Sequence, residues 1–134
     1  MRTKSLLFLL IFMALAAFAA NAQTSYSCTY REYCNWNEKL GDYETECRGY
    51  EESSLFVMNA NKTLFTHTTE KMKSTYYVKK TEYREDYNVT LYYVVSDVGN
   101  EYVYIFDPDN KEIRCLAEAD DYDTMIRFYV KAIF

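Results

Sequence analysis

Short apolar and aromatic runs recur along the chain from residue 54 onward, about every 10 to 13 residues, and polar turn clusters separate them. The runs are rich in tyrosine, valine, phenylalanine, isoleucine and threonine, which are the residues enriched in strands. This spacing is typical of an antiparallel β-meander. We therefore predict strands over residues 55–58, 64–69, 75–83, 89–96, 101–106 and 112–116.

The connectors between these runs are short, and two of them carry recognisable turn residues. Gly99 and Asn100 accept a positive φ, and Pro108 supplies the fixed φ of a type I turn. Connections of this length favour hairpins over crossover helices. Neighbouring runs are therefore expected to pair with each other.

Both faces of the predicted strands are partly apolar. In residues 89–96 the odd-numbered positions are valine, leucine or tyrosine, whereas the even-numbered positions combine Tyr92 and Val94 with threonine and serine. We expect this pattern if one face lines a core and the other is covered, or carries tyrosines whose hydroxyl groups tolerate water.

The last segment, residues 125–134, fits two patterns. Alternation of Ile126, Phe128 and Val130 with charged residues predicts a strand, whereas Met125, Phe128 and Tyr129 also fit a helical stripe. The enrichment in β-branched and aromatic residues favours the strand.

An N-terminal strand over residues 26–33 brings the total to about eight. Eight antiparallel strands joined by short turns can close and remove their exposed edges. We therefore predict an all-β fold: a small, disulfide-linked antiparallel meander shaped as a barrel or a strongly curved sheet. A two-sheet sandwich is the alternative.

Residues 1–22 have the composition of a signal peptide. A basic start with Arg2 and Lys4 precedes an apolar run of about 13 residues, and small residues follow at Ala20 and Ala22. The run is short for a membrane anchor, which needs roughly 20 residues. We expect cleavage before Gln23, no membrane span afterwards, and a secreted or periplasmic domain over residues 23–134 with a cysteine-rich part at 23–52.

All four cysteines lie beyond this segment, and an even number in an oxidising compartment indicates two disulfides. A bond between Cys28 and Cys34 would require a tight turn that the sequence does not indicate. We favour Cys34 with Cys47 and Cys28 with Cys115. The chain has no C-x-x-C motif, so we expect no metal site.

The charge balance is acidic. The whole chain has a formal net charge of −5, and loss of Arg2 and Lys4 with the signal segment leaves 13 basic against 20 acidic residues, or −7. Nucleic acid is therefore not an expected partner, since its recognition depends on basic residues. Three glycines and one proline leave no phosphate-binding loop, and we expect no cofactor.

Catalytic candidates are few, and we expect no enzyme. His67 is the single histidine, and no Gly-x-Ser-x-Gly motif accompanies it, so we interpret it as a structural or surface residue. The acidic stretches at residues 107–112 and 118–123 are interpreted as solvated turns, because they lack the spacing of a calcium loop. A small hydrolase using His67 or a carboxylate pair is an alternative.

Tyrosine is the unusual feature, with 15 in the chain. Aromatic residues crowd the cysteine-rich part, and exposed aromatic side chains anchor interfaces. We predict a non-enzymatic binding module for an unknown protein, glycan or small apolar ligand. An inhibitor of a basic lysozyme-like hydrolase, acting through connectors 107–111 and 118–123, is another alternative. The predicted binding residues are Tyr30, Tyr33, Trp36, Tyr43 and Tyr50.

Overall fold

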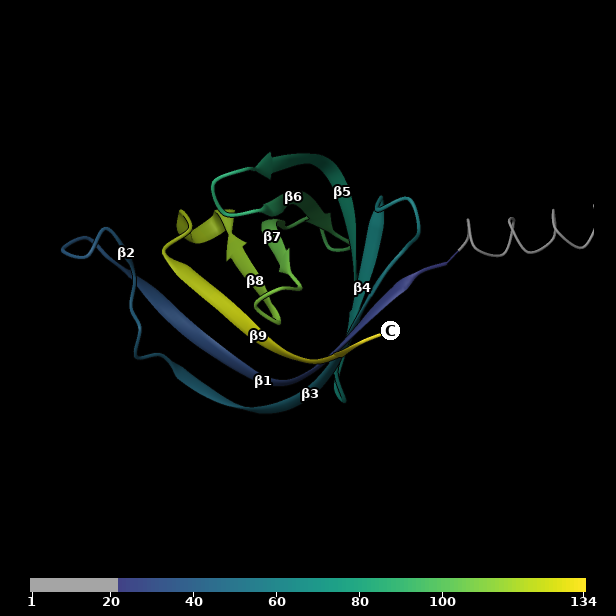
Figure 1. The fold of residues 1–134 in the computed structure, drawn as a ribbon, viewed down its shortest axis with the longest axis horizontal. Helices are drawn as coiled ribbons and strands as arrows, with labels where there is room; N and C mark the ends of the chain where they lie inside the picture. Colours follow the sequence, from purple (N-terminus) through teal and green to yellow (C-terminus); the bar gives the residue numbers. More distant parts are fainter. Residues whose placement is uncertain (1–21) are drawn as a thin grey trace, which may run out of the picture.

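The computed structural model describes residues 22–134, and these form one antiparallel sheet that closes on itself (Figure 1). Each strand pairs with its sequence neighbour from β3 to β9, and the closing pair joins β1 to β9. The predicted signal segment lies outside the described residues except for Ala22. The strands are β1 (Thr24–Asn37), β2 (Asp42–Tyr43), β3 (Arg48–Met58), β4 (Leu64–Thr68), β5 (Lys73–Arg84), β6 (Val89–Ser96), β7 (Glu101–Asp107), β8 (Glu112–Ala117) and β9 (Thr124–Ile133).

The prediction of an all-β barrel of about eight strands is confirmed, with β2 as an extra strand paired to the far end of β1. The last segment is the strand β9 rather than a helix. The described chain has one short 3₁₀ helix, η1 (Glu118–Asp120), and no helix that is long and apolar enough to cross a membrane.

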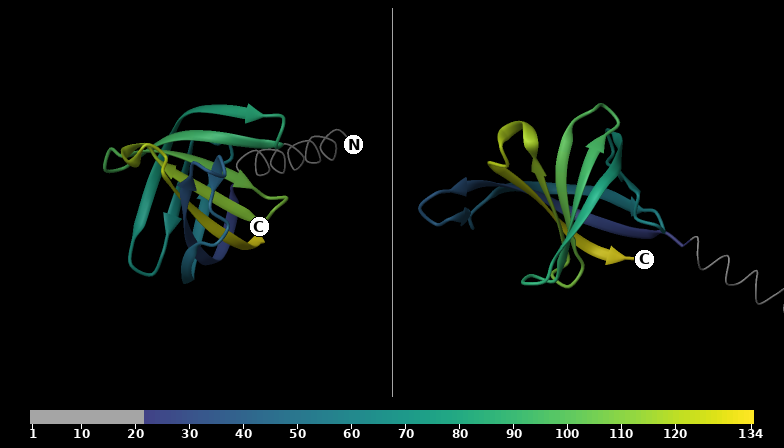
Figure 2. Two further views of the ribbon diagram at one scale, coloured as in Figure 1. Left: turned by 90° about the vertical axis from the view of Figure 1, so that its left-hand side faces the viewer. Right: turned by 90° about the horizontal axis from the view of Figure 1, so that it is seen from above.

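The first strand, β1, closes the barrel. β1 pairs with β3 along one edge and with β9 along the other, and the register shifts between Cys28 and Tyr30. Such bulges bend a strand and increase its twist, which helps a sheet to close. Beyond the bulge, β1 stays paired with β9 as far as Asn35, and its end projects from the barrel as an arm that carries β2 (Figure 2).

Aromatic side chains fill the interior of the barrel. Phe56 is fully buried and lies edge-on to Phe106 and Phe128, and Phe65 stacks on Tyr76 with ring centroids 5.0 Å apart. The even-numbered face of β6 points inward, and its Tyr92 and Val94 are part of the core. The interior therefore consists of packed rings at the preferred edge-on and offset geometries.

One of the two predicted disulfides is formed. Cys34 and Cys47 are bonded with Cα atoms 4.8 Å apart, which closes the β2 loop at the end of the arm. On the chain-entropy model a loop of this length contributes about 3 kcal/mol.

The predicted bond between Cys28 and Cys115 is wrong, because both residues are free thiols buried in the core. Cys28 is level with Val130 on β9, whereas Cys115 is level with Ile126. Four residues along a strand separate these levels by about 13 Å. A disulfide needs Cα atoms within about 7 Å, so the register keeps the two thiols apart.

Candidate functional site

A groove of about 820 Å³ lies between the first half of β3 and the turn that joins β4 to β5. We call it the β3 groove. Its floor and walls combine two tyrosines with carboxylate, hydroxyl and ammonium groups. The lining residues are Thr29, Tyr30, Tyr50, Glu51, Glu52, Ser53, Thr69, Glu70 and Lys71.

The groove exists because β4 is short. β4 pairs with β3 only from Met58 back to Leu55, and Leu55 is opposite Thr68. The chain then turns away, because the Thr69 hydroxyl accepts hydrogen bonds from the Lys71 and Met72 amides. Residues 48–54 of β3 therefore pair with β1 alone, as seen where β3 extends beyond β4 in Figure 1.

Tyr30 forms a fixed wall of the groove. A Cβ atom added to Gly49 would lie 2.6 Å from the Tyr30 hydroxyl oxygen and 2.6 Å from the Arg31 carbonyl oxygen. Gly49 thus lets the tyrosine ring lie directly across the backbone of β3. The ring also packs against Tyr129 of β9, with centroids 5.7 Å apart.

Arg31 supports two residues of the groove, Glu52 directly and Tyr50 through Tyr33. The Tyr50 ring stacks on Tyr33 at 6.4 Å, and Arg31 donates a hydrogen bond of 3.3 Å to the Tyr33 hydroxyl. Arg31 Nη2 also lies 2.7 Å from Glu52 Oε1, and the guanidinium lies 4.8 Å from the centroid of the Phe128 ring. These contacts fix the groove on a rigid base within the barrel.

Beneath the groove is a set of polar residues that we call the inner polar cluster: the partly buried Arg31 and Glu52 and the buried Ser54 and His67. The Arg31 Nε, Ser54 Oγ and His67 Nε2 atoms are buried without a hydrogen-bond partner among the described residues. Buried polar atoms are normally paired, so this cluster is an unusual feature of the fold.

His67 is placed inside the barrel rather than in a cleft. The residue is 4% exposed, and its ring stacks on Phe56 with centroids 4.0 Å apart. Burial, with a smaller contribution from the Arg31 charge, lowers the pKa of His67 to about 3. The imidazole is therefore neutral at pH 7.

The groove has an acidic character. Glu51 and Glu70 are exposed, and neither forms an ion pair within residues 22–134. Glu52 is matched by Arg31, and Lys71 supplies the one ammonium group of the lining. A cationic ligand would therefore gain Coulomb energy at the groove, and more so at low salt.

The five predicted binding residues do not form one patch. Tyr30 and Tyr50 line the β3 groove, and Tyr33 supports Tyr50. Trp36 and Tyr43 instead form an edge-on pair on the arm, with centroids 5.2 Å apart. The Tyr43 hydroxyl donates a 2.6 Å hydrogen bond to the carbonyl of Tyr122, so this pair fastens the arm to the barrel.

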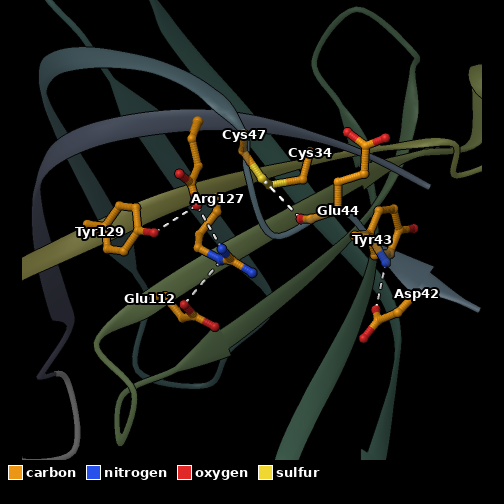
Figure 3. The surroundings of a disulfide bond; sticks show 9 residues. Cys34, Asp42, Tyr43, Glu44, Cys47, Glu112, Arg127 and Tyr129 are labelled. Atoms are coloured by element: carbon orange, nitrogen blue, oxygen red, sulfur yellow. Dashed lines mark hydrogen bonds and ion pairs between the residues drawn. A yellow bond between two sulfur atoms is a disulfide. The ribbon is translucent and has the colours of Figure 1, made fainter. Parts of the chain in front are cut away.

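An ion-pair network lies on the outer face beside the disulfide (Figure 3). Arg127 contacts Glu32 at 2.7 Å and Glu112 at 3.2 Å, and Tyr129 also donates a hydrogen bond to Glu32. Asp107 is buried and paired with Arg114 at 3.1 Å, so the interpretation of this residue as a solvated turn acid is wrong.

A second groove of about 600 Å³ lies above this network, between the β2 loop and the outer face of β6 to β9. Its three arginines, Arg84, Arg114 and Arg127, are each matched by a carboxylate. Asp42 and Glu44 of the β2 loop also line this groove and form no ion pair within residues 22–134, so the second groove is acidic as well.

One cluster of the described residues has the composition of a metal site. Ligand atoms of Glu32, Cys34 and Cys47 lie within 4.8 Å of one another. The two sulfur atoms are joined in the disulfide, so the oxidised protein offers no thiolate pair there.

The four charged residues of the groove were not among the candidates from the sequence: Glu51, Glu52, Glu70 and Lys71. Charged residues of this kind are common on any surface, and Glu70 and Lys71 are distant from Glu51 in the sequence. The one available indication is that residues 48–54 are polar yet directly precede an apolar strand segment.

Comparison with known proteins assigns no relative. The chain matches no family model, no curated protein and no solved structure.

Proposed function

We propose that the protein is a secreted or periplasmic, non-enzymatic binding module, and that the β3 groove binds a basic segment of a partner protein. The observation that carries this proposal is the pairing of two fixed tyrosine walls with exposed carboxylates, Glu51 and Glu70, along one preformed groove. Aromatic walls with a polar rim are features of protein-binding surfaces.

The packed interior supports a surface site over a ligand held inside the barrel. Phe56, Phe65 and Phe106 contact one another across the centre, where a small apolar ligand would have to lie. Binding there would require several rings to move from well-packed positions, which costs free energy. A groove on the outside imposes no such cost.

The burial of His67 supports a non-catalytic role. A general base needs access to a substrate proton and a pKa near the working pH. His67 is buried against Phe56 with a pKa lowered to about 3. The formed disulfide is compatible with an extracellular or periplasmic location.

Charge favours a basic partner. The described residues carry 13 basic and 20 acidic side chains, a net charge of −7. Long-range attraction of this kind raises association rates with cationic proteins and weakens as salt shortens the Debye length to about 8 Å. A basic lysozyme-like hydrolase is therefore a suitable test partner.

The test is a titration of the protein with a basic lysozyme at low and moderate salt. We expect Glu51→Gln with Glu70→Gln to weaken binding by about twofold to thirtyfold, because two exposed charges contribute roughly 0.2–1 kcal/mol each. The matched control is Glu85→Gln with Asp86→Asn, which removes the same charge from the exposed β5–β6 turn.

The acidic turn after β8 provides the competing surface. Asp120→Asn with Asp121→Asn removes two exposed charges there, and asparagine tolerates the positive φ at Asp121. A loss confined to the groove variant supports the proposal. Equal losses in all three variants, or a loss confined to the Asp120 and Asp121 variant, would contradict it.

A further inference from the structure

The first half of β3 has an open edge. Residues 48–54 pair with β1 on one side, and within residues 22–134 no backbone hydrogen bond reaches their other side. In a strand, alternate residues direct their N–H and C=O groups to opposite edges. About half of the backbone groups in this segment are therefore free to pair with another chain.

The β3 groove occupies the position that β4 would fill if it continued past Thr68. Residues 50–53 form one side of the groove, and the turn residues Thr69, Glu70 and Lys71 form the other. Residues 48–53 span about 20 Å when extended, which matches a strand of about six residues. The groove thus has the position and the length for one added strand.

We propose that the partner's basic segment binds in extended form and pairs its backbone with residues 48–53 as an additional strand. This inference rests on the proposed function and specifies its mode of recognition. Backbone pairing at a sheet edge gives affinity, while pockets for alternate side chains give selectivity.

The residues on the two faces of β3 determine which side chains of an added strand fit beside them. Ser54 and Phe56 point into the barrel, so Tyr50 and Glu52 share the inner face, and Glu51 and Ser53 share the outer face. An added strand would place one set of side chains beside the Tyr50 ring and the other set beside Glu51. Apolar residues alternating with lysine or arginine fit this arrangement.

A second copy of the chain is the competing occupant. Two β3 edges paired with each other would bring their glutamates together, and adjacent like charges on paired strands are destabilising. The chain also has a free edge on β5 beyond Val78, with Lys79 and Lys80. There Lys79 is paired with Glu101 and Lys80 lies over the Tyr93 ring, so both ammonium groups already have partners.

The experiment uses three capped hexapeptides of alternating lysine and valine, with binding measured by calorimetry at low salt. The first peptide is unmodified. The second carries methyl groups on the backbone amide nitrogens of its lysines, and the third carries them on the backbone amide nitrogens of its valines. The two modified peptides carry the same number of methyl groups and differ only in which edge of the strand is blocked.

We expect one methylated peptide to lose at least about tenfold in affinity, because three backbone hydrogen bonds of about 0.5–1.5 kcal/mol each are removed. The other should stay within about threefold of the unmodified peptide, since its methyl groups face solvent. Glu51→Gln with Glu70→Gln should lower the affinity for the unmodified peptide, and the control variant with Glu85→Gln and Asp86→Asn should not.

Equal affinities of the two methylated peptides would overturn strand addition while leaving the acidic binding groove in place. Failure of the unmodified peptide to bind would overturn the proposed function together with this inference. Sedimentation of the protein alone at rising concentration completes the test. A dimer that displaces the peptide would show that a second copy occupies the edge and would also overturn the inference.

Discussion

At the scale of single residues, His67 is a buried group whose protonation would destabilise the folded protein. The imidazole stacks on Phe56, lies edge-on to Phe128 and is affected by the positive charge of Arg31. Its Nε2 atom has no hydrogen-bond partner among the described residues. A protonated ring in this environment would be buried beside another cation.

This environment predicts an acid-sensitive stability. The pKa of His67 is lowered from 6.5 to about 3, so the unfolded chain binds a proton that the folded chain does not bind between these values. Above about pH 6.5 His67 is neutral in both states and does not lower the stability. Below it, the free energy of unfolding falls by up to about 1.4 kcal/mol per pH unit as the pH decreases toward 3. Urea unfolding at pH 7, 5.5 and 4 measures this slope.

The variant His67→Phe isolates the histidine from the carboxylates that also titrate in this range. We expect it to change the free energy of unfolding at pH 7 by less than about 1.5 kcal/mol, because the replacement is apolar and of similar shape. Its stability should decrease less on acidification than that of the parent protein. Identical slopes for the two proteins would show that His67 does not contribute.

At the scale of single elements, β3 shows why part of the fold follows from the sequence and part does not. The side chains of residues 55–58 alternate between the core and the outer face of the sheet, and the sequence pattern predicts this strand segment correctly. Residues 48–54 continue the same strand but have a neighbour on one side only. With little apolar surface to bury, their sequence is polar and carries no strand pattern.

The choice of inner face could not be predicted for a similar reason. In β6 both faces are rich in apolar residues, and the face with Tyr92 and Val94 forms the core. The outer face lines the second groove opposite the β2 loop, whose position depends on the Cys34–Cys47 disulfide and the Tyr43 hydrogen bond. Such contacts between distant segments leave no periodic pattern in the sequence.

Cys28 on β1 and Cys115 on β8 lead to a prediction about thiol reactivity. Burial raises the pKa of Cys28 to about 11 and that of Cys115 to about 12, so both remain protonated thiols at pH 7. We expect both to react slowly with a thiol reagent in the folded protein, because the thiolate is the reactive form. In denaturant two thiols per chain should react at once.

A count of no reactive thiols in denaturant would instead indicate a Cys28–Cys115 bond, and four would indicate an unformed Cys34–Cys47 bond. Rapid labelling of the folded protein would contradict the burial of both side chains. Peptide mapping of the labelled sites assigns each reactive cysteine and serves as the control.

At the scale of the whole molecule, the barrel removes all but a few of its strand edges by pairing β1 with β9. The exceptions follow from strand lengths, since β3 and β5 both extend beyond the short β4. An exposed edge is a hazard unless it is charged or used. In the strand addition proposed above, Glu51, which has no ion-pair partner within residues 22–134, would oppose self-pairing of the β3 edge and favour a cationic strand.

The closed barrel also explains why the sequence could predict the fold class but not the site. The strand spacing and short turns determine the meander, and the meander determines the closure. The β3 groove depends on where β4 ends, and that end is set by the Thr69 turn rather than by the alternation of the strand. The site is thus a consequence of one local turn within a regular fold.

The most direct test of the open β3 edge is amide hydrogen exchange by NMR, with and without the unmodified lysine–valine peptide. In the free protein, amides that point away from β1 within residues 48–53 should exchange rapidly, while their alternate neighbours are protected by pairing with β1. With peptide bound, the rapid set should become protected. Saturation with peptide that leaves these amides exchanging at their original rates would contradict the account.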